Sequence, residues 1–426
     1  MQVNGDRLWA DLMALAQIGA GAAGGNNRMA LTDADRDAKA LFAHWCREAG
    51  LAVSVDGLGN TFARLEGREP SLPPVFAGSH LDTQESGGRF DGPLGVLAAL
   101  EALRAITEAG IVPRRPVEVV NWTNEEGARF SPGLMGSAAF AGTLPLDRAH
   151  AVADRAGRTV GAELARLGWN GAAPMGGRPV DAYFELHIEQ GPLLEAAGVT
   201  IGAVTQSCHS AFTDAVCHGE TSHIQSTPMP QRRNALWGAA RLIDAIERTG
   251  FAHAPDGTAS AVVIDAWPNN RIVLPSRAGF SYGVMHLEED GLAAMVAAID
   301  ASAEAIAAET GLRFETVLRR VRRPFHTRRR RSANSAPTAR TGWRPARSRR
   351  RWPAPPDRSA PMGRKAAVRL LRLRRPQHGV PLQHAMGARA ERHGLATRLL
   401  RIARAHVGAY AARKAREAER QGSRAR

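Results

Sequence analysis

Two residues at the end of a short apolar run have types and spacing that suit a metal site. His80 and Asp82 are two positions apart, so their side chains lie on the same side of an extended chain. Asp82 can then accept the second ring N–H of His80, which is a usual arrangement around a metal-binding histidine. Asp91 follows across a Gly-Gly turn. A polar turn with a capping Asp and a solvent-facing His contains the same residues, so this segment alone leaves both interpretations open.

Two adjacent acids, Glu125 and Glu126, end a second apolar run. Neighbouring carboxylates repel each other unless cations compensate their charge. In a site with two metal ions, one such acid can bind metal while the other acts as a base toward the attacking water. A solvated acidic turn is the alternative interpretation.

A third candidate is His187, which stands between apolar neighbours just before Gly191 and Pro192. A single His in such a run is more often a hydrogen-bonded core residue than a ligand. Three such segments change the balance, because His, Asp, Glu and His form the nitrogen and oxygen donor set of a divalent-metal hydrolase.

Strands must position these residues, and three strand-like runs precede them, at 74–78, 117–121 and 182–186. The first run leads through a Gly-rich turn into apolar residues at helical spacing. Strand and helix therefore alternate as in a mixed α/β sheet, which binds ligands at the carboxyl ends of its strands. Residues 6–50 predict helices, with Thr32 as an N-cap.

The pattern changes from about Cys208 to a compact α+β unit with a hairpin. Its predicted elements are a helix at 234–248, strands at 259–267 and 278–285, and a helix at 290–310. The sequence therefore predicts a first part of a catalytic domain at 1–207, an inserted domain at 208–316 and a distinct tail at 317–426.

The formal net charge of +15 comes from the tail, which holds 32 Lys and Arg against 4 Asp and Glu, whereas residues 1–316 hold 24 against 37. The body is acidic, and nucleic acid is not an expected partner for it. A frameshift in GC-rich coding DNA near 317–331 fits the Arg-rich tail best, so the tail is predicted to be aberrant. A solvated basic tail and a nucleic-acid-binding tail are the alternatives.

The three Cys residues stand in no paired motif, so neither a disulfide framework nor a thiolate zinc site is predicted. The amino terminus carries acids and Gly rather than a basic start and an apolar run. No uninterrupted stretch of about 18 apolar residues is present, so we expect a cytoplasmic protein without a membrane partner.

Four motifs together carry a family resemblance: GSHLDT (78–83), GGRFDGPLGVL (87–97), NWTNEEGARF (121–130) and HIEQGPLLE (187–195). They resemble the carbamoylase branch of the M20-type metal-dependent amidohydrolases, which comprises N-carbamoyl-L-amino-acid hydrolases, β-ureidopropionases and allantoate amidohydrolases. The resemblance implies an α/β fold: a metallopeptidase-like catalytic domain with a mixed sheet and an inserted α+β lid and dimerisation domain. It also implies a homodimer that hydrolyses a small ureido or amide substrate.

The resemblance assigns roles to the residues of the first domain. It implies two divalent ions per subunit, from zinc, manganese, cobalt or nickel. The implied ligands are His80, Asp91 and His187 for one ion, and Asp91 with Glu126 for the other. Glu125 would be the base toward water, Asp82 the partner of His80, and Gln190 a contact of the ureido group.

The resemblance also assigns roles in the inserted domain. It implies that His223 reaches the partner subunit's site and stabilises the oxyanion, and that Asn270 and Arg271 belong to the loop that binds the substrate carboxylate. Ile272 stands where the family usually has Asn. Gly283 and Met285 replace a common Asp and Arg, which removes a bidentate partner for an α-carboxylate.

The carboxy-terminal motifs of the family, Gly-His-Asp-Ala and Ser-His-Asn-Glu, are missing from the sequence. The second His normally completes the second metal site, so that site is expected to be incomplete. Hydrolysis of an N-carbamoyl-L-amino acid to amino acid, carbon dioxide and ammonia is the leading prediction. An allantoate or β-ureido acid amidohydrolase, and an inactive dimeric remnant, are the alternatives.

Overall fold

The computed structural model describes residues 2–21, 24–191, 193–196, 201–204, 207–322 and 366–371, which form two compact units that divide near residue 205. The first unit is built on a seven-stranded sheet of order β1-β2-β4-β3-β5-β11-β6. Its strands are β1 (Ala52–Val55), β2 (Thr61–Leu65), β3 (Val75–His80), β4 (Val117–Trp122), β5 (Ala182–Ile188), β6 (Ile201–Ala203) and β11 (Ala366–Leu371).

The three predicted strands are present as β3, β4 and β5, and they form one parallel block. β3 pairs in parallel with both β4 and β5. Every residue of β3 and β4 is buried, as expected for parallel strands covered on both faces. Their carboxyl ends therefore meet at one edge of the sheet. β2 pairs antiparallel with β4, which confirms that the sheet is mixed.

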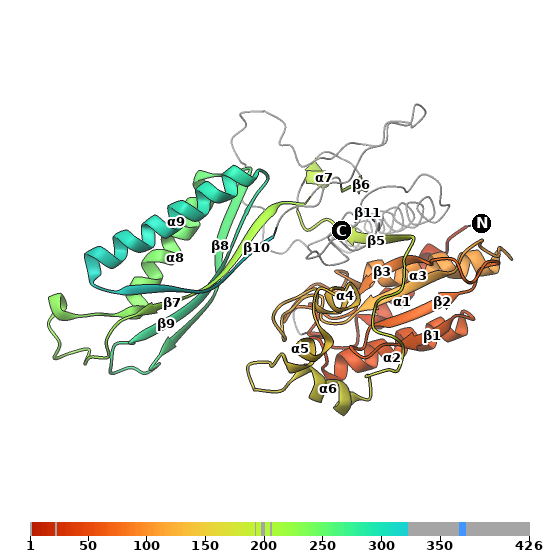
Figure 1. Cartoon of the computed structure of the whole chain (residues 1–426), viewed down its shortest axis with the longest axis horizontal. Helices are drawn as coiled ribbons and strands as arrows, with labels where there is room; N and C mark the ends of the chain where they lie inside the picture. Colours follow the sequence, from red (N-terminus) through yellow and green to blue (C-terminus); the bar gives the residue numbers. More distant parts are fainter. Residues whose placement is uncertain are drawn as a thin grey trace, which may run out of the picture. The chain divides into compact units, whose positions relative to one another are not determined.

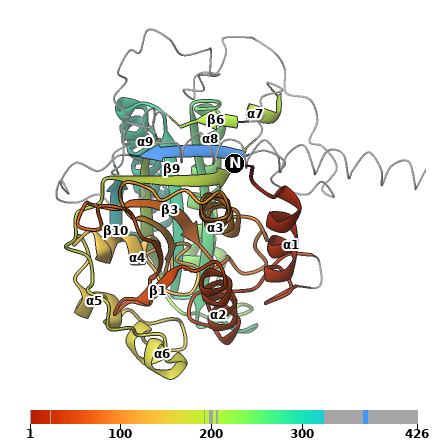
Figure 2. The same ribbon diagram turned by 90° about the vertical axis from the view of Figure 1, so that its right-hand side faces the viewer.

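Three helices, α1 (Gly5–Leu15), α2 (Asp33–Glu48) and α3 (Pro93–Glu108), lie on the same side of this sheet (Figure 2). Their apolar residues share one core with β3, β4 and β5. The predicted N-cap is confirmed, because the Thr32 side chain accepts the backbone N–H of Asp35. α3 follows β3 through the Gly-rich turn, so the helix starts next to the strand end that carries His80.

An aromatic cluster covers the opposite face of the sheet. Phe62, Phe76, Trp122, Phe140 and Tyr183 contact one another through ring centroids 5.4–6.5 Å apart. The ring of Phe140 comes from α4 (Met135–Phe140). The short helices α5 (Leu146–Ala151) and α6 (Val160–Leu167) enclose a further small core, and α7 (Leu193–Ala196) is a single turn.

The second unit is an α+β sandwich of one sheet and two long helices, as predicted. The sheet has the order β10-β7-β9-β8 and is antiparallel throughout. Figure 1 shows the two long helices side by side along the same face of this sheet. Its elements are β7 (His209–His218), the 3₁₀ turn η1 (Met229–Gln231), α8 (Ala235–Ala252), β8 (Gly257–Trp267), β9 (Arg277–His286), α9 (Glu289–Thr310) and β10 (Arg313–Arg322).

Among the described residues, α9 is long and apolar enough to cross a membrane by length and composition. No such segment was predicted from the sequence, because only uninterrupted apolar runs were considered there. Acids such as Asp300 and Glu304 interrupt α9. Leu292, Met295 and Ile299 of α9 lie in the apolar core of the second unit. The helix is therefore a packed element of that unit.

The last strand of the second unit, β10, continues past the boundary predicted after residue 316. β10 continues in register with β7 up to Arg322, with one bulge after Thr316. Residues 366–371 form β11, whose backbone pairs antiparallel with β5 and parallel with β6. A strand from the predicted tail thus belongs to the catalytic sheet, whereas the rest of the tail beyond Arg322 lies outside the described residues.

Shortening Phe76 tests the aromatic face of the sheet. We expect Phe76→Ala to lower the free energy of unfolding by about 3–5 kcal/mol, because the fully buried ring is lost and leaves a cavity. Val112→Ala, at a 58% exposed position of the same unit, is the control and should stay within about 0.5 kcal/mol of the parent. Urea titration measures both values, and equal stability of the two variants would contradict the packing described.

Candidate metal centre

His80 is held in one ring orientation at the end of β3. The side chain is buried, and its Nδ1 lies 2.8 Å from the backbone carbonyl of Asp82. Because a carbonyl only accepts, Nδ1 carries a proton, and Nε2 is the ring nitrogen left to bind a cation. Nε2 lies 3.4 Å from Oε2 of Glu125. The ring is therefore oriented as a metal-binding His is, with its second nitrogen fixed by a backbone carbonyl.

The carboxylate of Asp82 has a different partner from the one predicted. Its Oδ1 is 3.7 Å from His80 Nδ1, so the hydrogen bond goes to the Asp82 carbonyl instead. Strand alternation was the basis of the prediction, and it ends with β3 at His80. The carboxylate oxygens accept the backbone N–H groups of Glu125 and Glu126, each at 3.2 Å. Asp82 therefore ties the turn after β3 to the turn after β4.

The turn that carries Glu125 and Glu126 is closed by local hydrogen bonds. Asn124 has a positive φ of 53°, a conformation that Asn tolerates better than most residues. Its side-chain amide donates to the Phe130 carbonyl at 2.7 Å, and the Leu134 N–H donates to the Glu125 carbonyl at 2.7 Å. Both acids thus project from a fixed loop.

A second His–carboxylate pair forms between β5 and the start of α3. His187 Nδ1 donates to the carbonyl of Ile188 at 2.7 Å, which leaves its Nε2 lone pair 3.2 Å from Oδ1 of Asp91. The Gln190 side-chain amide donates to the other carboxylate oxygen of Asp91. Oδ1 of Asp91 is buried without a hydrogen-bond donor. The two rings therefore repeat one pattern, with Nδ1 fixed and Nε2 facing an acid.

Gly92 makes room for the His80 ring. It has a φ of +80°, and a Cβ built on it would lie 2.5 Å from Cε1 and Nδ1 of His80. Only Gly combines this backbone conformation with the close approach. Asp91, His80 and the start of α3 are brought together by this one residue.

The cluster carries more negative than positive charge. Burial lowers the pKa of His80, but the carboxylates of Glu125, Asp82, Glu126 and Asp91 outweigh it and raise that pKa to about 10. For the acids burial acts in the opposite direction: it raises the pKa of Glu125 to about 7 and that of Asp82 to about 6. Acids in such a site favour a bound cation, since it offsets their repulsion.

The donor set fits divalent cations, although among the described residues no group of three or more His, Cys, Asp or Glu side chains is arranged to hold a metal ion. Nε2 of each His lies 3.2–3.4 Å from a carboxylate oxygen, and this contact is favourable only when Nε2 carries a proton or when a cation binds both atoms. The donor-free Asp91 Oδ1 lies at one of these contacts. Imidazole nitrogen and carboxylate oxygen together suit zinc, manganese, cobalt and nickel.

Three polar residues near the candidate centre were not predicted from the sequence. Gln84 donates to Oε2 of Glu126 at 2.7 Å from the turn after β3. Glu185, two residues before His187, is buried and accepts the hydroxyls of Ser79 and Tyr183 at 2.8 and 2.9 Å. Lys39 is buried, with its Nζ 3.1 Å from Asp35 and 3.3 Å from Thr123. The Lys signal was readable, because Asp35 and Lys39 stand four apart on the apolar side of a helix.

The predicted residues His223, Asn270 and Arg271 lie in the second unit, where two loops bring them near each other. Ile224 N–H donates to the Ile272 carbonyl at 3.0 Å, and Leu274 N–H donates to the Ser222 carbonyl at 2.7 Å.

His223 is exposed, and its Nδ1 accepts the backbone N–H groups of Gln225 and Ser226 at 3.2 and 3.3 Å. Its Nε2 therefore carries the proton, so this ring is a donor toward solvent. Asn270 Oδ1 accepts the backbone N–H groups of Ile272 and Val273 at 2.9 and 3.0 Å, which shapes the loop that carries Arg271.

Adding one methyl group at Gly92 tests the geometry of the His80 pocket. We expect Gly92→Ala to displace the ring and weaken divalent-ion binding by at least about tenfold, as changes around a metal-binding His do. Gly88→Ala, in the same turn with nothing within 4 Å and without a positive φ, is the matched control and should bind as the parent does. Equilibrium dialysis with zinc measures both, and unchanged binding by Gly92→Ala would contradict the arrangement.

Comparisons with known proteins place the chain in a family. Residues 76–316 match the model of peptidase family M20/M25/M40. The N-carbamoyl-L-amino-acid amidohydrolase of Rhizobium meliloti is 44% identical over 311 residues, which cover 73% of this chain and 75% of that protein. The crystal structure of an amidase of the hydantoinase/carbamoylase family from Burkholderia vietnamiensis has 45% sequence identity and a TM-score of 0.73, with 76% of this chain and 79% of that chain covered.

A more distant relative carries a different name. The allantoate deiminase of Arabidopsis thaliana is 30% identical over 288 residues, which cover 60% of this chain and 54% of that protein. With the α/β fold, the donor cluster and these matches together, the chain belongs to peptidase family M20/M25/M40 and, within it, to the carbamoylase branch.

Proposed function

We propose that the protein is a metal-dependent amidohydrolase that cleaves a linear C–N bond in N-carbamoyl-L-amino acids. The observation that carries the proposal is the pair of His–carboxylate contacts, His80 with Glu125 and His187 with Asp91, at the carboxyl ends of adjacent parallel strands. The 44% identity to an N-carbamoyl-L-amino-acid amidohydrolase supports the choice of substrate.

Two divalent cations per subunit would be held by this donor set. His80, His187 and Asp91 would hold one, and Asp91 with Glu126 would hold the other, which lacks the family's carboxy-terminal His. Zinc, manganese, cobalt and nickel all suit these ligands. When bound, such ions polarise a carbonyl oxygen and make water acidic enough to yield a nucleophile at neutral pH.

Glu125 is placed to move the proton. Its side chain is 19% exposed, compared with 1% for His80 and 3% for Asp82, so it is the most accessible of these three. Its pKa of about 7, raised first by burial, suits a group that accepts and then releases a proton near neutrality. We assign it the acceptance of the water proton and its delivery to the leaving nitrogen.

The reaction balances with water as the only co-substrate. The water oxygen bonds to the ureido carbon, the bond from that carbon to the amino-acid nitrogen breaks, and that nitrogen takes the proton. The other product, carbamic acid, decomposes to carbon dioxide and ammonia.

The remaining predicted residues would recognise the two ends of the substrate. Gln190 stands beside Asp91 and would contact the ureido group. Asn270 and Arg271 would bind the carboxylate. The Nε2–H donor of His223 would stabilise the oxyanion in the partner subunit of a homodimer, since a fixed donor aimed at developing charge lowers the barrier. A cytoplasmic location stays a prediction.

One feature of the second unit favours a different substrate. Gly283 and Met285 on β9 supply no cation where the family commonly has an Arg. Without a bidentate partner, an α-carboxylate binds less selectively. Allantoate or a β-ureido acid is therefore the second candidate, and the relative named allantoate deiminase is consistent with it.

Replacing the proposed base separates catalysis from metal binding. We expect Glu125→Gln to lower kcat by about 10²–10⁴-fold on an N-carbamoyl-L-amino acid, because the side chain no longer accepts a proton. The metal content should be unchanged. Glu85→Gln removes an exposed acid from the neighbouring turn and should keep the parent kcat. Activity of Glu125→Gln within threefold of the parent would disprove the role, and loss of bound metal would make Glu125 a ligand instead.

A substrate panel decides between the two candidates. The proposal predicts a kcat/KM for an N-carbamoyl-L-amino acid at least tenfold above those for allantoate and for an N-carbamoyl-β-amino acid, with ammonia release as the readout. The reverse order would favour the second candidate. No ammonia from any of the three, with divalent ions present, would favour the inactive remnant.

A further inference from the structure

Two arginines link the loops of the candidate centre through a backbone segment, 26–31, that contributes no ligand: the buried Arg28 belongs to this segment, and Arg129 donates to two of its carbonyls. We infer that Arg129 and Arg28 are positioning residues that set the spacing between the Glu125–Glu126 loop and the His80–Asp82 turn through residues 26–31. The inference rests on the proposed function, because these loops carry the proposed ligands and base.

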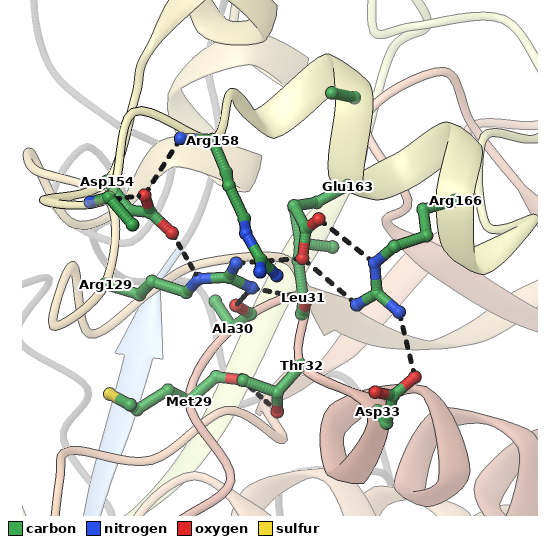
Figure 3. A network of polar contacts seen from close by, with 12 residues as sticks. Met29, Ala30, Leu31, Thr32, Asp33, Arg129, Asp154, Arg158, Glu163 and Arg166 are labelled. Atoms are coloured by element: carbon green, nitrogen blue, oxygen red, sulfur yellow. Dashed lines mark hydrogen bonds and ion pairs between the residues drawn. The ribbon is translucent and has the colours of Figure 1, made fainter.

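Arg129 forms the junction on the side of the acidic loop (Figure 3). Its Nη1 donates to the carbonyls of Leu31 at 2.6 Å and Ala30 at 3.3 Å. Its Nε and Nη2 donate to Asp154 at 3.0 Å and Glu163 at 2.8 Å. The side chain is 11% exposed. The planar fork of Arg thus binds two carboxylates and two carbonyls at once, which the single ammonium of Lys cannot reproduce.

A displacement of Arg129 would also displace Glu125, because a short and fixed stretch of chain connects the two residues. Arg129 follows Glu125 by four residues, and its guanidinium lies 4.7 Å from the ring centroid of its fully buried neighbour Phe130. The Phe130 carbonyl accepts the amide of Asn124, which directly precedes Glu125. The loop is therefore anchored at both sides of the acidic pair.

Arg28 forms the matching junction on the side of the His80 turn. It is fully buried, and its Nε donates to the Leu81 carbonyl at 2.8 Å. Its backbone N–H donates to the Thr83 hydroxyl at 2.9 Å, and its carbonyl accepts the Thr83 N–H at 2.9 Å. Arg28 thus holds the residues on either side of Asp82.

These contacts close a ring. Asp82 accepts the backbone N–H groups of Glu125 and Glu126, which joins the two loops directly. A second connection runs through the segment 26–31: Arg129 donates to Leu31 in this segment, and Arg28 of the segment donates to Leu81 in the His80 turn. A ring of contacts fixes a distance better than either side alone. Breaking it at any one point should release both loops, so the two arginines should act as one unit.

Arg166 offers a control within the same polar network. Its Nε and Nη2 donate to Glu163 at 3.0 Å, and its Nη1 donates to Asp33 at 3.0 Å (Figure 3). No hydrogen bond from its side chain to residues 26–31 is found in the described part of the chain. Arg166→Lys therefore perturbs the ion pairs around Glu163 and leaves the ring intact.

The experiment uses the full-length chain with Arg129→Lys, Arg28→Lys, the double variant and Arg166→Lys. Titration with cobalt(II), followed by the visible absorption of the ion, gives the metal affinity. Hydrogen exchange of the Glu125 and Glu126 amides, without metal, reports the contact with Asp82. We expect each single variant to bind cobalt about 10–100-fold more weakly and to exchange these amides faster. The double variant should resemble the single ones, and Arg166→Lys should stay within twofold of the parent.

Several results would overturn the inference. Parent-like cobalt affinity and amide exchange in Arg129→Lys, with only a lower Tm, would reduce Arg129 to a structural role. Additive losses in the double variant would make the two arginines independent. If the parent binds no cobalt, the proposed function fails, but the exchange measurement still decides whether the ring holds the loops together.

Discussion

The repulsion among carboxylates at the carboxyl ends of β3, β4 and β5 is the constraint on which this structure depends. The parallel block brings Asp82, Asp91, Glu125 and Glu126 to one edge, with two His rings among them. Unpaired acids at this density would drive the loops apart or take up protons. Backbone N–H donors to Asp82, the Gln84 amide and the His pairs offset part of the repulsion. A divalent cation would offset the rest.

The parts of the fold that the sequence predicts are those decided by local patterns. Near-continuous apolar runs at 74–78 and 117–121 could only be buried parallel strands or core helices, and their lengths favoured strands. Thr32 capped its helix as expected. Since polar residues follow each run, the topology of a parallel block predicts that His80, Asp91, Glu125 and His187 lie at one edge of the sheet. In the structure His80 contacts Glu125 and His187 contacts Asp91.

The rest could not be predicted because it depends on contacts distant in sequence. The hydrogen bond of His80 to the Asp82 carbonyl follows from the turn after β3, which strand alternation cannot describe. Arg28 and Arg129 look like ordinary polar residues in the sequence, and only the fold shows that Arg28 donates to Leu81 in the His80 turn while Arg129 donates to Leu31 in the segment that holds Arg28. The extension of β10 to Arg322 crosses a change in composition, because a strand whose residues are mostly exposed tolerates several Arg side chains.

Metal stoichiometry of the full-length parent chain tests the central claim most directly. Equilibrium dialysis against zinc or manganese, with ion content per chain measured by mass spectrometry, should give at least one tightly bound ion, and a second that binds more weakly because its carboxy-terminal His is missing. The double variant His80→Ala with His187→Ala should lose the tight ion. A parent chain that binds no divalent ion, or a double variant that binds as the parent does, would contradict the account.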